Sequence, residues 1–179
     1  MIDPYLLRRL LYGLLFLAIS GLIIFTRMLP LHSGAQAFPP PDLILCFAFA
    51  WTVRRPDYMP VLLVAAVLLL GDMLSLAPPG IAPLLAILGI EAIRSRRGLL
   101  SDQGFAVEWA SVAAIMFLMM LAERLILGVF MVPQVAFGIT VLSLLVTVVF
   151  YPVTVLISTL GFRISWMKPG SIDPEARTA

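Results

Sequence analysis

The sequence predicts an all-α integral membrane protein, built as a bundle of six transmembrane helices. Hydrophobic residues make up 61% of the chain and charged residues 12%, about half the charged fraction of a soluble domain. The mean hydropathy is +1.06. Long apolar runs alternate with short segments rich in proline, glycine and arginine, as expected where membrane helices alternate with loops.

The scarcity of cysteine and histidine excludes several kinds of site. Cys46 and His32 are the single residues of their types, so the chain cannot form an internal disulfide, a paired-cysteine metal site or a cluster of histidine ligands. We expect no cofactor and no metal. The sequence pI near 9.0 would suit nucleic acid, but the basic residues flank the apolar runs. The positive charge therefore indicates membrane topology, and we expect no binding of nucleic acid.

The first helix is expected over about residues 8–28. Arg8 and Arg9 precede an uncharged apolar run, which resembles a secretory signal. Arg27 and Pro30 then separate this run from the nearest sequence that looks like a cleavage site, so the match to a signal is poor. We expect the segment to be retained as the first transmembrane helix.

The second and third helices are expected over about residues 42–53 and 59–76. Pro41 fits the first position of the second helix, where its missing N–H is no loss, and Asp42 suits the positive end of the helix dipole. The third helix would be about 27 Å long at about 1.5 Å per residue, close to the thickness of a bilayer core. It carries Asp72 near its far end, and we expect the other helices to surround it.

Three further helices are expected over about residues 81–93, 105–127 and 139–160. The fourth would end at the run of arginines that follows it, and Pro152 predicts a kink in the sixth. Residues 1–160 would then form one transmembrane domain, followed by a polar cytoplasmic tail over residues 161–179.

The distribution of basic residues predicts the orientation of the bundle. With a cytoplasmic N-terminus and six spans, only Arg27 and Arg124 of the 12 basic residues would lie outside. This is a strong positive-inside bias, and it places both termini in the cytoplasm. The basic residues on the cytoplasmic side are Arg8, Arg9, Arg54, Arg55, Arg94, Arg96, Arg97, Arg163, Lys168 and Arg177.

A carboxylate at the depth of Asp72 is costly unless it faces protein, water or a counter-charge. Arg27 and Arg124 are expected on the same side of the membrane, so one hypothesis is a buried ion pair of Asp72 with either arginine. It predicts that Asp72→Asn destabilises the bundle and that a charge swap restores it. In the alternative, Asp72 caps the Pro-Gly turn that follows, or lies hydrated at the boundary.

The fifth helix carries two further features. Glu108 lies near its start, where a carboxylate suits the positive end of the helix dipole. Ala106, Ala110 and Ala114 recur every four residues, a spacing of small residues that lets membrane helices approach closely. We expect this stripe to pack within the bundle, and a seam with another molecule is the alternative.

The short loops limit the function. No segment outside the expected helices is long enough to form a domain, so the protein would act through its membrane-embedded surface or a cavity in the bundle. A scaffold, a solute-binding or transport subunit and an intramembrane enzyme are the three classes left. Catalysis is the least supported, because a serine site needs a histidine base and His32 lies in an external loop. Asp42 and Asp72 both lie toward the external side and could meet there, but neither has a context typical of an aspartyl site.

The stretch over residues 41–80 resembles the bacterial rod shape-determining family MreD. Its members have a proline that opens the second helix, an aromatic residue ten positions on and a further proline five positions later. They also carry an aspartate late in the third helix and a glycine eight positions beyond it. Two positions depart from the pattern, since Pro40 replaces a common arginine and Leu68 a common glycine. The matching residues here are Pro41, Trp51, Pro56, Asp72 and Gly80.

This resemblance implies a non-enzymatic subunit of the cell-elongation machinery in the bacterial inner membrane. Its direct partner would be the bitopic protein MreC, and its indirect partners the polymerase RodA with its penicillin-binding transpeptidase, and the MreB cytoskeleton. The family fold is similar to the S-components of energy-coupling-factor vitamin transporters. We expect the bundle to receive the transmembrane helix of MreC in a groove, with membrane lipids around it, and the alanine stripe is one candidate for that face.

The alternative is a true S-component that binds a vitamin or another small solute. S-components resemble one another in an Ala-xxx-Ala spacing on the first helix, which the small residues of this first helix do not form. A solute site also needs several convergent polar groups. The candidates on the external side are Asp42, Asp72, Ser75 and Glu123.

Overall fold

The structure is a computed structural model that describes residues 4–29, 39–56, 59–75, 77–101 and 103–161. These residues form no strand and six α-helices: α1 (Pro4–Met28), α2 (Leu43–Arg54), α3 (Val61–Leu74), α4 (Ile81–Ser101), α5 (Phe105–Val129) and α6 (Phe137–Leu160). The prediction of an all-helical chain is confirmed. The expected tail lies outside the described residues, apart from its first residue.

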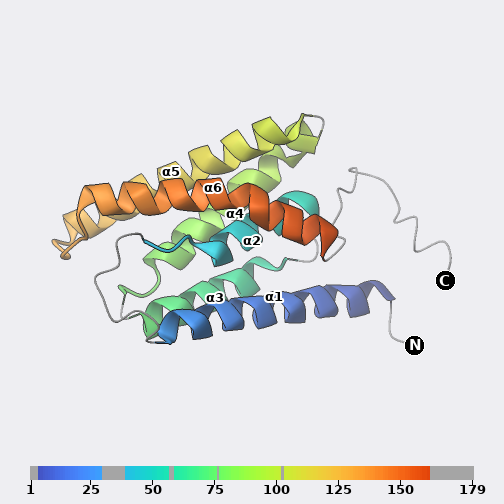
Figure 1. Ribbon diagram of the computed structural model, residues 1–179, viewed down its shortest axis with the longest axis horizontal. Coiled ribbons are helices and arrows are strands. Elements are labelled where there is room, and N and C mark those ends of the chain that lie inside the picture. The colour runs from blue at the N-terminus through green and yellow to red at the C-terminus, as the bar shows by residue number, and fades with distance from the viewer. Residues whose placement is uncertain (1–3, 30–38, 57–58, 76, 102, 162–179) are drawn as a thin grey trace.

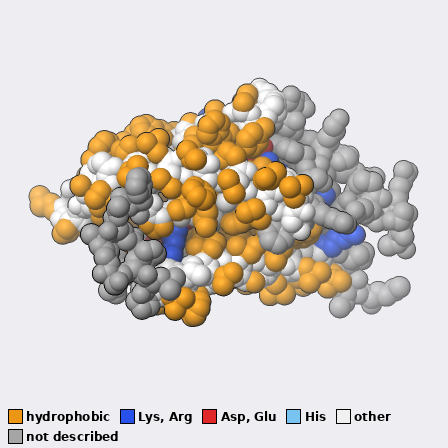
Figure 2. All heavy atoms as spheres, in the orientation of Figure 1, with side chains coloured by type: hydrophobic (Ala, Val, Ile, Leu, Met, Phe, Trp, Pro, Cys, Tyr) orange, Lys and Arg blue, Asp and Glu red, His pale blue; other side chains and the backbone are white. Residues whose placement is uncertain are grey.

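Three of the helices are long and apolar enough to cross a membrane, over Leu6–Met28, Phe105–Val129 and Phe137–Leu160. Figure 2 shows hydrophobic side chains over most of the face in view. Leu22, Leu118 and Leu125 are exposed by 64%, 62% and 70%. An apolar surface of this extent suits lipid and would be unusual on a soluble monomer. The chain therefore has the character of a membrane protein.

The bundle has three layers of two helices (Figure 1). Helices α2 and α4 form the middle layer, with α1 and α3 on one side and α5 and α6 on the other. Successive helices run in opposite directions, so α1 begins and α6 ends at the same end of the bundle. We call this end the basic end. The described arginines on it are Arg8, Arg9, Arg54, Arg55, Arg94 and Arg96.

Helix α2 is the buried centre of the bundle. Every residue from Cys46 to Arg54 is buried, whereas α3 buries only Val64 and Val67. The expectation that the other helices surround the third one is therefore wrong. Helix α2 is apolar around its whole circumference until its last turn, and such a helix is stable only when other elements enclose it.

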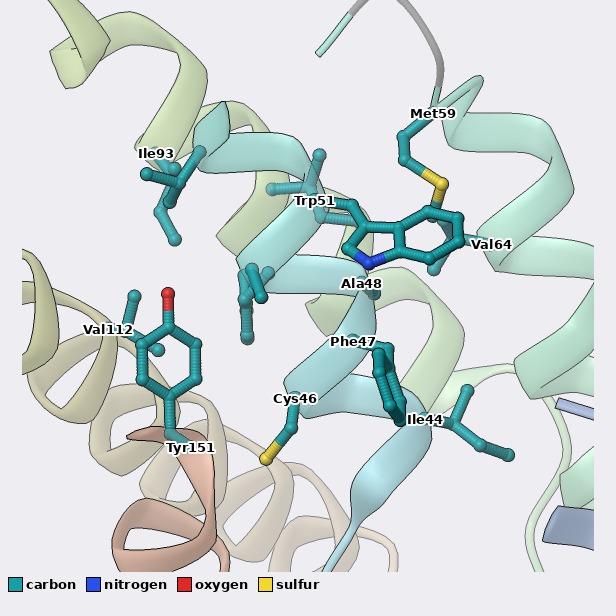
Figure 3. Close-up of a cluster of buried hydrophobic side chains, with 14 of the residues drawn as sticks. Ile44, Cys46, Phe47, Ala48, Trp51, Met59, Val64, Ile93, Val112 and Tyr151 are labelled. Carbon is teal, nitrogen blue, oxygen red and sulfur yellow. The ribbon is translucent and has the colours of Figure 1, made fainter. Parts of the chain in front are cut away.

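Trp51 of α2 lies in the middle of the core (Figure 3) and is 1% exposed. Its ring contacts Tyr12, Phe16 and Phe47 at centroid distances of 6.2, 5.9 and 6.4 Å, the spacing of favourable aromatic pairs. Its indole Nε1 donates a hydrogen bond of 2.9 Å to Ser158 Oγ. One side chain thus joins α1, α2 and α6.

Five of the helices agree with the expected boundaries to within four residues, and α4 is the exception, because it ends at Ser101 instead of about residue 93. Helix α3 has 14 residues, about 21 Å at 1.5 Å each, because Pro60 is extended at its start and Ser75 ends it. This length is short of a bilayer core. Helix α4 continues through the arginines to Ser101, since arginine is a good helix former and a polar residue ends a membrane span without ending the helix.

Asp42 is the N-cap of α2, and the helix begins at Leu43, so Pro41 precedes the cap and is not the first helical residue. The Asp42 carboxylate accepts a hydrogen bond of 3.4 Å from Leu45 N–H. The Asp42 N–H donates to Thr147 Oγ1 of α6 at 3.0 Å. The start of α2 is thereby fixed to α6.

Candidate functional site

Asp72 holds the turn between α3 and α4. Its carboxylate Oδ2 accepts a hydrogen bond of 3.3 Å from Gly80 N–H, and its carbonyl accepts one of 3.0 Å from Ala77 N–H. Gly80 has a φ of +97°, which residues with a side chain rarely adopt. The arrangement in the structure is thus the alternative in which Asp72 caps the turn.

The ion pair of Asp72 with either arginine, the other hypothesis, is not formed in the structure, where both arginines have other partners. Arg27 lies 3.5 Å from Asp42 Oδ1 and donates a hydrogen bond of 2.9 Å to the carbonyl of Pro41. It therefore ties the end of α1 to the start of α2. Both partners are about 40% exposed, so this pair contributes little to stability.

Arg124, the other arginine considered, organises the turn between α5 and α6. It donates to Thr140 Oγ1 at 2.8 Å and to the carbonyl of Val135. Its guanidinium lies 5.1 Å from the centroid of the Phe137 ring, within the range of a cation–π contact. The Arg124 side chain therefore contacts the start of α6 and does not pair with Asp72.

A cavity of about 160 Å³ opens between α2, α3, α4, α5 and α6 at the end opposite the basic end. Of the four polar candidates for a solute site on this side, Asp42 and Glu123 line the cavity, while Asp72 and Ser75 do not. Among the described residues, no group of three or more histidine, cysteine, aspartate or glutamate side chains could hold a metal ion. The lining residues are Asp42, Leu45, Leu68, Ala82, Leu85, Met116, Met119, Met120, Glu123, Thr140, Ser143, Leu144 and Thr147.

A buried polar network lies near the basic end. Arg54 of α2 and Glu108 of α5 form an ion pair with Nη1–Oε1 of 2.8 Å and Nη2–Oε2 of 3.3 Å. Their side chains are 3% and 2% exposed. Tyr151 Oη of α6 donates to Glu108 Oε1 at 2.7 Å, and Arg54 Nη1 also donates to the carbonyl of Ala50 at 3.2 Å. The network joins three helices and satisfies charges that would be costly in isolation.

The sequence reasoning missed this network. It placed Arg54 among the cytoplasmic surface charges and explained Glu108 by the helix dipole. A signal was present, because Glu108 lies at helical spacing with Val112 and Ile115, and these share one buried face of α5. A carboxylate on such a face requires a partner on a neighbouring helix.

Helix α6 runs through Pro152, which has no N–H to offer to the carbonyl of Val148 one turn before it. Trp109 of α5 replaces the missing donor, since its Nε1 donates a hydrogen bond of 2.9 Å to that carbonyl. A proline inside a membrane helix is tolerated when a neighbour satisfies the carbonyl it frees. Trp109 therefore belongs to the packing of α5 against α6.

The alanine stripe faces outward. Ala106, Ala110 and Ala114 are all exposed, so the expectation that they pack within the bundle is wrong. The buried residues of α5 lie on the opposite side of the helix, around Val112 and Met116. We call the three alanines the alanine face.

An apolar groove of about 430 Å³ is lined by residues of α5 and α6. It runs along the second half of α6 and ends at Phe105, the residue before Ala106 of the alanine face. An outer surface with small residues beside a groove allows another helix to approach closely. The residues that line the groove are Phe105, Pro152, Val153, Val155, Leu156 and Thr159.

No protein-family model, curated protein or solved structure matches the chain. Fold and site define an all-helical membrane protein with an outward alanine face, a cavity lined by two carboxylates at one end and a buried ion pair at the other. The resemblance to MreD depends on residues 41–80, and the matching residues described here hold helices and turns together. Asp72 and Gly80 hold one turn, Trp51 centres the core, and the carbonyl of Pro56 accepts a hydrogen bond from Arg94.

Proposed function

We propose that the protein is a non-enzymatic scaffold of the bacterial inner membrane that binds the single transmembrane helix of a bitopic partner. It would cross the membrane six times, with the basic end and both termini in the cytoplasm. The observation that carries the proposal is the alanine face beside the apolar groove on α5 and α6. The resemblance to MreD names the partner as MreC, and through it RodA with its transpeptidase, and MreB.

Membrane helices gain nothing from the hydrophobic effect when they associate, because lipid tails are as apolar as leucine. Close van der Waals contact between backbones must supply the affinity, and small residues permit it. Three outward alanines at intervals of four residues are therefore better suited to a partner helix than an outer surface of leucines. Helix α1, by contrast, exposes a run of large side chains that includes Leu10 and Leu14.

The two short helices fit a six-span arrangement for different reasons. Helix α2 is buried from Cys46 to Arg54, so its short length does not bring it into contact with lipid. Helix α3 begins only after an extended segment in which Met59 is buried. Irregular backbone at membrane depth is tolerated where protein covers it.

Co-purification tests the partner. We expect the tagged protein, extracted in mild detergent from its native membrane, to recover MreC together with a polymerase and a transpeptidase. Ala110→Leu, on the alanine face, should reduce this recovery severalfold. Ala66→Leu is the matched control, because Ala66 is also an exposed alanine but lies on α3. Equal recovery by both variants would contradict the assignment of the face.

Cysteine labelling tests the orientation. The native Cys46 is buried and its Sγ donates to the carbonyl of Thr147, so it gives a low background. Met131→Cys, at a position exposed by 91% beyond the end of α5, should react with an impermeant maleimide in intact spheroplasts. Arg96→Cys should react only after the membrane is opened. The reverse pattern would overturn the proposed topology.

A solute-binding function is the second candidate, and the cavity between five helices favours it. It offers two carboxylates and several hydroxyls at one end of the bundle. Its volume of about 160 Å³ is smaller than the roughly 300–1,000 Å³ of sites for drug-sized ligands. Recovery of an ATPase with a long transmembrane coupling subunit, without MreC, would support this function and contradict the scaffold.

A further inference from the structure

A hollow of about 360 Å³ opens at the basic end between α1, the start of α3 and α4. Two arginines from different helices line it, Arg9 of α1 and Arg94 of α4. The described residues that line it include no carboxylate, and the two guanidinium groups are the charged groups among them. The remaining lining residues are Pro56, Met59, Pro60, Val61 and Leu62.

Arg94 is held in place from inside the protein. Its Nη2 donates to the carbonyl of Pro56 at 3.2 Å and to that of Met59, and its Nη1 lies 3.8 Å from Glu91 Oε2. About a quarter of the side chain remains exposed. These contacts fix one guanidinium at the wall of the hollow before any ligand arrives.

Arg9 is differently placed. It is exposed, and within the described part of the chain it forms no hydrogen bond or ion pair. A guanidinium without a partner, facing a hollow with a second guanidinium on its wall, is suited to an anion that both can contact. Arginine binds phosphate especially well, because its planar donors match pairs of phosphate oxygens.

Below the two arginines the surface becomes apolar. Leu62, which lines the hollow, is exposed by 83%, and Leu10 and Leu14 of α1 are exposed by 62% and 61%. Helices α1 and α3 lie side by side here (Figure 1), with Leu63 3.6 Å from the position of a Cβ on Gly13. A lipid whose phosphate lies at the arginines would therefore place its acyl chains on this apolar surface. A free phosphate ion has no apolar part that would contact it.

We propose that this hollow binds the phosphate of an anionic phospholipid, with the acyl chains along the exposed leucines of α1 and α3. Basic pockets between membrane helices at the cytoplasmic surface hold such headgroups. The site is separate from the alanine face, which lies on the opposite outer layer of the bundle. Bound lipid would hold α1 against α3, where α1 packs on the bundle with few buried residues.

Native mass spectrometry of the full chain in detergent tests the proposal. Phosphatidylglycerol and phosphatidylcholine with the same acyl chains are titrated in turn, and soluble glycerol phosphate is titrated as a third probe. We expect phosphatidylglycerol to bind more tightly than phosphatidylcholine. Arg9→Gln should weaken its binding about fivefold, as expected from about 1 kcal/mol per basic residue near an anionic surface.

Arg96→Gln is the matched control, because Arg96 is an exposed arginine at the same end of α4 and does not line the hollow. Its effect on phosphatidylglycerol binding should be less than twofold. Equal losses in the two variants would mean a diffuse attraction to the basic end and would overturn the site. Binding of glycerol phosphate as tight as that of the lipid would overturn the lipid as its source.

Discussion

Arg54 and Glu108 form a two-point ion pair between α2 and α5, beside a core of buried apolar side chains. The guanidinium and carboxylate planes share two short contacts, and Tyr151 supplies a third donor to the carboxylate. Neither charge is exposed by more than 3%. The pair connects the central helix of the bundle with the helix that carries the alanine face.

Removing one member of this pair should be costly. Glu108→Gln or Arg54→Gln leaves the other charge buried without its partner, and we expect a loss of about 3 to 5 kcal/mol in the free energy of unfolding. Unfolding of the purified protein in a denaturing detergent would measure it.

The double variant Arg54→Met with Glu108→Leu is the control, since it removes both charges and keeps apolar volume. We expect it to be more stable than either single variant. If its loss equalled the sum of the two single losses, the pair would have no energetic coupling, and the prediction would fail.

The bond between Trp109 and the carbonyl of Val148 should matter only because Pro152 is present. Trp109→Phe keeps the ring and removes the donor, with an expected cost of about 0.5 to 1.5 kcal/mol. In a Pro152→Ala background the new N–H can bond the Val148 carbonyl. The cost of Trp109→Phe should then become smaller, and an unchanged cost in a double-mutant cycle would contradict this explanation.

The hydrogen bond between Asp72 and Gly80 leads to an expected stability loss for Asp72→Asn that is smaller than the ion-pair hypothesis implies. Asp72→Asn keeps an oxygen that can accept from Gly80 N–H, so we expect a loss below about 1 kcal/mol. Gly80→Ala should cost about 1 to 2 kcal/mol, because its φ lies in the left-handed region.

The charge swap of Asp72→Arg with Arg124→Asp distinguishes the two hypotheses. We expect the stability loss of the swapped protein to equal the sum of the losses of its two single variants, because the two side chains do not interact. Recovery of stability in the swapped protein, measured by thermal unfolding in detergent, would restore the ion pair as the correct explanation.

Gly89 of α4 packs closely against α2 and α5. A Cβ there would lie 2.9 Å from Met119 Sδ, 3.0 Å from Phe49 Cζ and 3.1 Å from Ile115 Cγ2. Gly89→Val should therefore cost about 1 to 3 kcal/mol by overpacking. Gly71→Val is the control, because nothing lies within 4 Å of a Cβ at Gly71. Similar thermal stability of both variants would show that the packing around Gly89 is loose.

The sequence by itself determined the class of the protein and the positions of its helices. Hydrophobicity, prolines and charge runs are local signals, so six helices were expected, and the described residues form six. The differences from the expected boundaries have local causes too. Pro60 delays the start of α3, and arginines that leave the apolar region continue α4 to Ser101.

Only the tertiary structure decided which helix is central, which charges meet and which side of α5 faces outward. In a soluble bundle a polar face shows the outside of each helix. A membrane helix is apolar on both its lipid side and its protein side, so periodicity does not distinguish them. Arg54 and Glu108 are 54 residues apart, and only the packing of α2 against its neighbours brings them together.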